Sequence, residues 1–231
     1  MSTNTATDQP RIVLLINPNT NQDTTAMMGG LAAIELAGTD LEVVGITAAL
    51  GPRMLIEPNA LRDSAEHVCE AVRKYLAGPS GARVAAVIVS AIGDPGRAEL
   101  ASSLSVPVVG IGQASILAAS ADDRAFAMAT STPMLADSLS ELVQAEGRSE
   151  YFLGISLTES GPLELAADPE AQFHELHAAV GRAANDGAKA VIIAGGPLSE
   201  TARRLAVEGL AEIIEPIPSA CRLVLTLLAA G

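Results

Sequence analysis

The stretch RIVLLINPNT (residues 11–20) decides the fold, because a run of branched apolar residues ends abruptly in a polar turn. Arg11–Ile16 is typical of a buried strand, and the Asn17-Pro18-Asn19-Thr20 segment that follows favours a turn and a helix start. The same succession returns at Arg83–Val89, which runs through Ser90 into the turn Gly93-Asp94-Pro95-Gly96. Strand, polar loop and helix in alternation indicate βαβ units around a parallel sheet.

Further strands are predicted at Leu41–Thr47 and Val106–Ile111, and the apolar spacing of Ala60–Leu76 predicts a helix. The second half of the chain repeats this order at an offset of roughly 104 to 113 residues. Four segments of the second half match the four strands of the first half in order, two of them with the polar loop that follows. They are Ala125–Ala129 with Thr130-Ser131-Thr132-Pro133, Phe152–Ser156, Ala190–Ile193 with Ala194-Gly195-Gly196-Pro197, and Glu215–Ser219. Any two α/β halves look alike to some degree, but ordered agreement of strands and loops favours duplication.

The duplication predicts two pseudo-symmetric, Rossmann- or flavodoxin-like α/β lobes, one covering residues 11–115 and the other 116–231. The C-terminal segment could instead pack back on the first lobe. Ligands of parallel sheets bind beyond the carboxyl ends of the strands. We therefore expect the loops after the first and third strands of each half to line one interlobe cleft.

The composition of the chain limits the kinds of partner and the cellular compartment that we expect for it. Hydrophobic residues make up 49% and aromatic residues 2% of the chain, so a core of Ala, Val, Ile and Leu is expected. The formal net charge of −13 would repel nucleic acid. No apolar run approaches the roughly 18 residues of a membrane helix, and the start, Met1–Pro10, reads as a polar tail. We therefore expect a cytoplasmic protein that does not contact a membrane.

Three ordered stretches resemble the hydantoin racemase branch of the aspartate/glutamate racemase superfamily. They are Ile16–Thr20, Gly93–Gly96 with Pro107–Gly112, and Ala194–Leu198. The resemblance implies a two-lobed enzyme with one cysteine per lobe, the two thiols facing each other across the α-carbon of the substrate. One thiol removes the proton and the other returns it on the opposite face. It also implies a small-molecule substrate, no cofactor and a homo-oligomer.

This chain departs from that pattern at both thiol positions. The first cysteine of the family aligns with Ala91 and the second with Gly195. The two cysteines of this chain, Cys69 and Cys221, lie elsewhere and are expected to be reduced core residues. The scaffold and the pocket are thus expected to persist with a different chemistry.

Short polar side chains of the predicted cleft are candidates for substrate contact. They can hold a carboxylate or a cyclic amide, although capping the next helix would suit them equally. The candidate substrate-binding residues are Asn17, Asn19, Thr20, Ser90, Ala91, Gly93, Thr130, Ser131, Thr132, Gly195, Gly196 and Leu198. The backbone N–H groups of Gly195, Gly196 and Leu198 could form an oxyanion-binding nest, or the segment could be a plain turn.

Two carboxylates are candidates for a catalytic base. Asp94 lies next to the lost first cysteine, and burial could raise its pKa, but an Asp-Pro-Gly turn explains it equally. Glu57 lies in a segment that covers the active site in the resembling family, and it could also be a solvated surface residue. His174 and His177 share a helix without further metal ligands, and His67 reads as surface, so no metal is expected. Nucleotide-binding glycine motifs are missing from the sequence.

The sequence therefore predicts an enzyme that acts on a small carboxylate, cyclic amide or ureide without a thiol. Isomerisation is one possible reaction, and hydrolytic ring opening or a lyase step is another. The remaining alternative is a non-catalytic binding protein that has kept the pocket.

Overall fold

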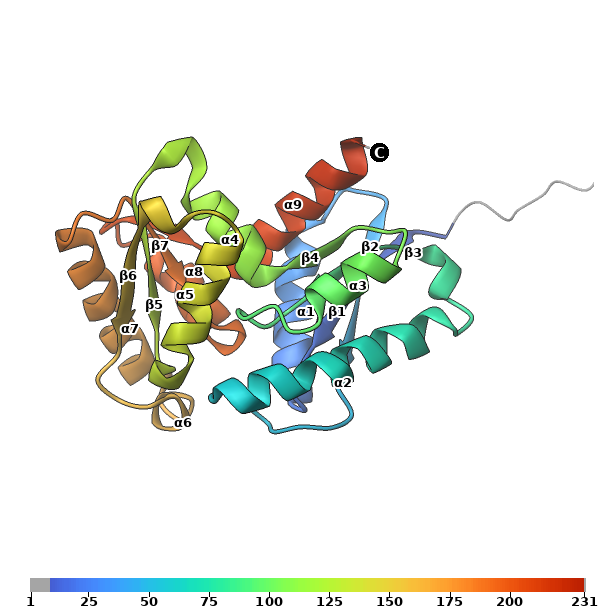
Figure 1. Ribbon diagram of the computed structural model, residues 1–231, viewed down its shortest axis with the longest axis horizontal. Coiled ribbons are helices and arrows are strands. Elements are labelled where there is room, and N and C mark those ends of the chain that lie inside the picture. Colours follow the sequence, from blue (N-terminus) through green and yellow to red (C-terminus); the bar gives the residue numbers. More distant parts are fainter. Residues whose placement is uncertain (1–8, 231) are drawn as a thin grey trace, which may run out of the picture.

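The computed structural model describes residues 9–230 and has two α/β lobes, each built on a four-stranded parallel sheet (Figure 1). The predicted tail overlaps residues 1–8, which lie outside the described part. The first sheet has the order β2-β1-β3-β4, with β1 (Arg11–Asn17), β2 (Leu41–Thr47), β3 (Val84–Val89) and β4 (Val108–Gly110). The second has the order β6-β5-β7-β8, with β5 (Phe126–Thr130), β6 (Phe152–Leu157), β7 (Ala190–Ile193) and β8 (Glu212–Ile214).

Helices cover both faces of each sheet, as parallel strands that are apolar on both sides require. The α-helices are α1 (Gln22–Glu35), α2 (Pro58–Leu76), α3 (Arg97–Ser103), α4 (Ile111–Ala119), α5 (Ala136–Ala145), α6 (Pro162–Leu165), α7 (Pro169–Asn185), α8 (Ser199–Leu205) and α9 (Pro216–Ala230). Single 3-10 turns are η1 (Gly81–Arg83), η2 (Ala121–Asp123), η3 (Pro133–Leu135), η4 (Ser149–Tyr151) and η5 (Gly196–Leu198).

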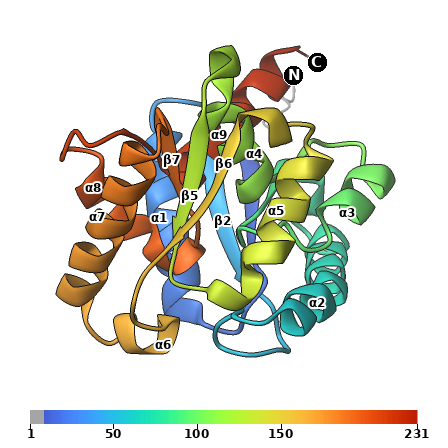
Figure 2. The same ribbon diagram turned by 60° about the vertical axis from the view of Figure 1, so that its left-hand side comes forward.

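The identical strand order of the two sheets confirms the predicted two-lobed architecture. In each lobe the first strand lies between the second and the third, so β1 and β5 are central and buried. Their carboxyl ends lie at the end of the molecule where α6 and the loop before α2 are drawn (Figure 2), and residues of both segments line the interlobe cavity.

One prediction at the end of the chain was wrong. Glu215–Ser219 does not form a strand, because β8 ends at Ile214 and α9 begins at Pro216. Proline is favoured in the first turn of a helix, where the backbone N–H that it lacks would have no partner within the helix. Pro216 and Pro218 therefore mark a helix start, and β8 is the true counterpart of β4.

The last helix of the chain leaves its own lobe. Side chains of α9, among them Ile217, Cys221 and Val224, share a core with Val13 and Met28 of the first lobe. The helix α4, which connects the lobes, contributes Ile111 and Ala114 to that core. Its other face, Ile116 and Ala119, packs in the second lobe. Figure 1 shows α9 crossing from the second lobe to lie beside the first sheet.

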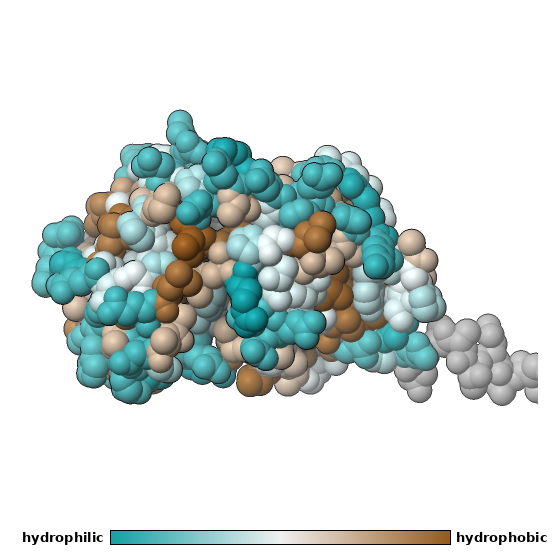
Figure 3. All heavy atoms as spheres, turned by 90° about the horizontal axis from the view of Figure 1, so that it is seen from below, coloured by the Kyte–Doolittle hydropathy of each residue, from teal (hydrophilic) through white to brown (hydrophobic). Residues whose placement is uncertain are grey.

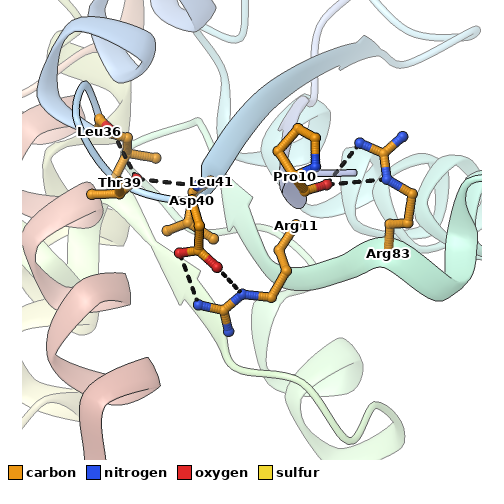
Figure 4. Close-up of polar contacts among 7 residues, drawn as sticks. All are labelled: Pro10, Arg11, Leu36, Thr39, Asp40, Leu41 and Arg83. Atoms are coloured by element: carbon orange, nitrogen blue, oxygen red, sulfur yellow. Dashed lines mark hydrogen bonds and ion pairs between the residues drawn. The ribbon is translucent and has the colours of Figure 1, made fainter. Parts of the chain in front are cut away.

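Polar contacts fasten the amino ends of the strands, opposite the interlobe region (Figure 4). Arg11 forms an ion pair with Asp40, with 2.8 Å between Nε and Oδ2. The guanidinium of Arg83 donates to the Pro10 carbonyl at 2.7 Å. Both pairs are exposed, so their contribution to stability is small.

The surface has no extensive apolar face in the view of Figure 3, where hydrophobic patches are separated by hydrophilic residues. None of the helices within residues 9–230 is both long and apolar enough to span a bilayer.

Candidate active site

One compact cavity of about 60 Å³ lies between the two lobes. The loops after the first and third strands of both sheets contribute to it, together with the segment before α2 and residues at α6. The loop residues lining the cavity are Asn19 after β1, Ser90, Ala91, Ile92 and Gly93 after β3, Thr130, Ser131 and Thr132 at β5, and Ala194, Gly195, Gly196, Pro197 and Leu198 after β7.

Hydroxyl groups tie the ends of neighbouring strands together around this cavity. Ser90 Oγ donates to the carbonyl of Ile16 at 2.7 Å, which fixes the end of β3 against β1. In the second lobe, Thr130 Oγ1 donates to the carbonyl of Ala194 at 2.8 Å. These two hydroxyls therefore serve the scaffold, although both residues line the cavity.

Asn17 and Thr20 are the two predicted substrate-binding residues that do not line the cavity. Asn17 is buried, and its amide nitrogen donates to Asn19 Oδ1 and Thr25 Oγ1. Thr20 faces the loop after β2, where its N–H donates to the Pro52 carbonyl at 3.1 Å. Both residues support the loop that presents Asn19.

Asp94 also lies outside the cavity lining. Its two carboxylate oxygens accept hydrogen bonds from the backbone N–H groups of Gly112 and Gln113, at 2.8 and 2.6 Å, at the start of α4. Arg97 Nε lies 3.8 Å from the same carboxylate. Burial raises the pKa of Asp94 to about 7, and the two backbone hydrogen bonds oppose this rise. The geometry favours the turn role of Asp94 over contact with a ligand.

Glu57 is exposed at the position before α2 and does not line the cavity. Two apolar residues of the same segment, Met54 and Leu55, do line it. The segment thus covers the cavity with apolar side chains, and its carboxylate lies outside.

Of the three backbone N–H groups in the predicted nest, two already donate to backbone carbonyls. The N–H of Gly195 donates to the Ile193 carbonyl at 3.1 Å, and the N–H of Leu198 donates to the Gly195 carbonyl at 3.0 Å. Gly196 is buried in the lining and supplies the remaining N–H of the three.

The sequence analysis missed several lining residues, of which Thr24 and Gln172 are polar. Gln172 lies on the buried stripe of α7 with Leu176, Ala179 and Val180. A glutamine on an otherwise apolar stripe was the signal that could have identified it. The apolar additions within the predicted loops are Ile92, Ala194 and Pro197, and those outside them are Met54, Leu55, Leu61, Leu135, Pro162 and Ala166.

The cavity contains no titratable side chain among the described residues that line it. Cys69 and Cys221 are buried in the two cores of the first lobe, which confirms that they are core residues. Within residues 9–230, no group of three or more His, Cys, Asp or Glu side chains is placed to hold a metal ion. His67 is only half-buried, and its Nδ1 is enclosed without a hydrogen-bond partner, so it is not the plain surface residue that was predicted.

The chain is thus a two-lobed α/β protein in which matched loops of two parallel sheets with the same strand order enclose a cavity, at the place where parallel α/β folds bind small molecules. Residues 13–224 match the family model described as Asp/Glu/Hydantoin racemase, and the chain belongs to this family.

Two curated relatives are hydantoin racemases. The one from Pseudomonas sp. (strain NS671) is 30% identical over 199 residues, which cover 85% of this chain and 77% of the relative. The one from Paenarthrobacter aurescens is 27% identical over 221 residues, covering 95% and 92%. Among solved structures, allantoin racemase from Klebsiella pneumoniae superposes with a TM-score of 0.86 at 22% identity, covering 96% of this chain and 89% of that one. This last similarity shows the shared fold.

Proposed function

We propose that this chain is an isomerase that moves a proton on a small cyclic amide, ureide or carboxylate held in the interlobe cavity. The observation that carries the proposal is the closure of polar loops from both lobes around one cavity. The membership in a racemase family and the two hydantoin racemase relatives support an isomerisation.

The cavity is suited to stabilising an enolate-like intermediate. A proton beside a carbonyl becomes more acidic when the carbonyl oxygen accepts hydrogen bonds that strengthen as negative charge develops. The cavity offers the amide of Asn19, the hydroxyl of Ser131 and the N–H of Gly196 as donors. We propose these three groups as the stabilising set.

A base has to come from outside the lining, since none of the described lining residues is titratable and the predicted thiol positions hold Ala91 and Gly195. We propose Glu57 ahead of Asp94, because both oxygens of Asp94 already accept hydrogen bonds from α4. Glu57 would act either after a shift of its segment or through a water in the cavity, which is large enough for one. The same carboxylate could activate water for ring opening.

The test uses an optically pure 5-substituted hydantoin in D2O. Loss of optical rotation with deuterium at the α-carbon, faster than without protein, supports isomerisation. Consumption of the ring shows a hydrolase or lyase instead. Glu57→Gln should lower turnover about 10²-fold, the usual scale for a general base. The matched control is Glu66→Gln, at an exposed position of α2 that does not line the cavity. An unchanged rate in Glu57→Gln would exclude Glu57 as the base.

A second candidate is a binding protein without catalysis. The observation that favours it is the lack of a titratable side chain among the described residues of the lining. Tight binding of the same hydantoin with no change in its rotation would support this role.

A further inference from the structure

Gln172 is a buried polar side chain that the second lobe contributes to the lining of the cavity. The residue lies on α7, is 8% exposed and lines the cavity together with Pro162 and Ala166 of the α6 region. A buried amide has to satisfy both its oxygen and its nitrogen. The partners of the two atoms therefore show what the side chain can offer a ligand.

The orientation of the Gln172 amide is fixed by two neighbours. Thr201 Oγ1 donates to Gln172 Oε1 at 2.6 Å. On the other side, Gln172 Nε2 faces the carbonyl of Leu165 at 3.4 Å. A flipped amide would place its oxygen against that carbonyl oxygen, which is repulsive. The nitrogen carries two N–H groups, and the long contact with Leu165 occupies only one of them.

The first lobe presents a second amide held in the same way. Asn19 Oδ1 accepts from Asn17 Nδ2 at 2.9 Å and from the N–H of Asn21 at 2.8 Å. Its amide nitrogen has no partner among the described residues. Each lobe therefore holds the oxygen of one buried amide and leaves amide N–H groups for the cavity.

We propose that Gln172, held in place by Thr201, donates a hydrogen bond to a carbonyl oxygen of the ligand and is a specificity-determining residue of this site. The inference rests on the proposed function, which places the ligand in this cavity. Asn19 is the matching donor on the first lobe, so the favoured ligand carries acceptor oxygens on two sides.

The charge of the ligand follows from the same lining. The described lining residues include no carboxylate for an ammonium group and no Arg or Lys for a carboxylate. Burying an unpaired charge is far more costly than burying a carbonyl that finds a donor. The cavity therefore selects an uncharged cyclic amide or ureide over a free amino acid.

The experiment compares three probes in calorimetric titrations: hydantoin and its two analogues that each lack one ring carbonyl. Gln172→Leu should weaken hydantoin binding about 10- to 100-fold, because a ligand oxygen is left without its donor. Binding of the analogue that lacks the partnered carbonyl should not weaken further in this variant. The matched control, Gln144→Leu, changes an exposed glutamine of α5 and should change neither affinity.

Thr201 provides a variant that acts only through Gln172, since it is buried and does not line the cavity. Thr201→Val should weaken hydantoin binding several-fold, and Thr201→Ser should restore it because the hydroxyl returns. Thr226→Val, at an exposed position of α9, is the control. The melting temperature of each unliganded variant verifies folding, and Thr201→Val carries the test if Gln172→Leu does not fold.

The outcomes separate the inference from the proposed function. Equal losses for hydantoin and for both analogues would show a merely structural role and overturn the inference. Full hydantoin affinity in folded Gln172→Leu would overturn it as well, while leaving the proposed function intact. Failure of the unsubstituted protein to bind any of these probes would overturn the proposed function, and the inference with it.

Discussion

Asp94 shows how one side chain at the edge of the site organises its surroundings. Its backbone has a φ of 49°, a left-handed conformation that aspartate tolerates in turns. The carboxylate lies so close to Gly110 that a Cβ atom there would be 2.0 Å from Asp94 Cγ. Glycine at position 110 therefore leaves the room that the Asp94 carboxylate needs to accept hydrogen bonds from the N–H groups at the start of α4.

The raised pKa of Asp94 predicts a pH dependence of folding. Burial raises the pKa from its ordinary value of 3.8 to about 7, so the folded chain holds a proton that the unfolded chain has lost between these values. The contribution of Asp94 to stability therefore falls as pH rises from about 4 to about 7. Asp94→Asn should remove this slope, measured as the melting temperature across that range. Asp137→Asn, on the exposed start of α5, is the control and should keep the wild-type slope.

The two cysteines give a second prediction for single residues. Cys69 and Cys221 are 1% and 0% exposed, and neither lines the cavity. Burial raises the pKa of the Cys221 thiol to about 12, which makes it unreactive. Changing both to Ala should cost about 1 kcal/mol of unfolding free energy at each position. Affinity for hydantoin, measured by calorimetry, should stay within about twofold, and its complete loss in a folded double variant would contradict the core assignment.

The roles of individual polar residues were only partly predictable from the sequence. Asn17 and Asn19 look equivalent in the polar Asn17–Thr20 segment of the sequence, yet Asn17 ends β1 and its amide donates to Thr25, while Asn19 lines the cavity. Gln172 reaches the site from the middle of α7, far from any motif. Which of two similar side chains lines the cavity depends on hydrogen-bond partners that are distant in the chain, and these partners cannot be identified from the sequence.

At the scale of elements, the strands were more predictable than the helices that follow them. Leu41–Thr47 and Ala190–Ile193 were predicted with their observed bounds. Ala190–Ile193 is apolar and buried throughout, as is typical of an inner parallel strand, whereas Leu41–Thr47 is a half-buried edge strand that β-branched residues still mark. The short helix α6 was not foreseen, since four residues give no periodicity. Yet α6 is one of the elements that cover the cavity.

The carboxylate of Glu175 holds the segment before α6 in place, so removing its charge should loosen that segment alone. Glu175 of α7 accepts hydrogen bonds from the N–H groups of Glu159 and Ser160, at 2.9 and 2.8 Å. Its pKa is lowered, chiefly by the hydrogen bond from the Ser160 hydroxyl. The lowered pKa means that this contribution is present above the ordinary value of 4.5 and is lost as pH falls through the folded value.

Glu175→Gln should therefore loosen residues 159–166 without unfolding the lobe. Hydrogen–deuterium exchange should rise about tenfold in that segment at pH 7, whereas the global melting temperature should change little, because the pair is near the surface. Glu141→Gln, on the exposed face of α5, is the control. Unchanged exchange in the segment would show that Glu175 does not order it.

At the scale of the molecule, the two lobes are not independent units. Val224 of α9 is fully buried in the core of the first lobe, although α9 follows the last strand of the second. Val224→Asp would place a carboxylate in that core and should lower the unfolding free energy by about 3 kcal/mol or more. Leu227→Asp, on the same helix at a position 41% exposed, should cost less than about 1 kcal/mol. Equal losses in denaturant unfolding would show that α9 does not close the first lobe.

The opposition of the two lobes across one cavity also predicts what two thiols would do at the positions that the sequence resemblance assigns to cysteines. Ala91 and Gly195 line the cavity from opposite lobes, one after β3 and the other after β7. Gly195 has an extended backbone with a φ of 169°, so a side chain there is not strained. A Cβ atom at Gly195 would meet Leu198 Cγ and Cδ1 at 3.1 Å, which a small shift of that side chain relieves.

The combined variant Ala91→Cys with Gly195→Cys should therefore racemise an optically pure 5-substituted hydantoin at least about 10²-fold faster than the unsubstituted chain. Each single variant should gain far less, because one thiol has to remove the proton while the other supplies it on the opposite face. Polarimetry measures the rate, and the paired serine variant is the control, since a hydroxyl is too weak a base to replace a thiolate. Alkylation of the new thiols should abolish the gain. A folded double variant with two reactive thiols and no gain in rate would mean that these positions do not face a common α-carbon, and the binding role would then be favoured over catalysis.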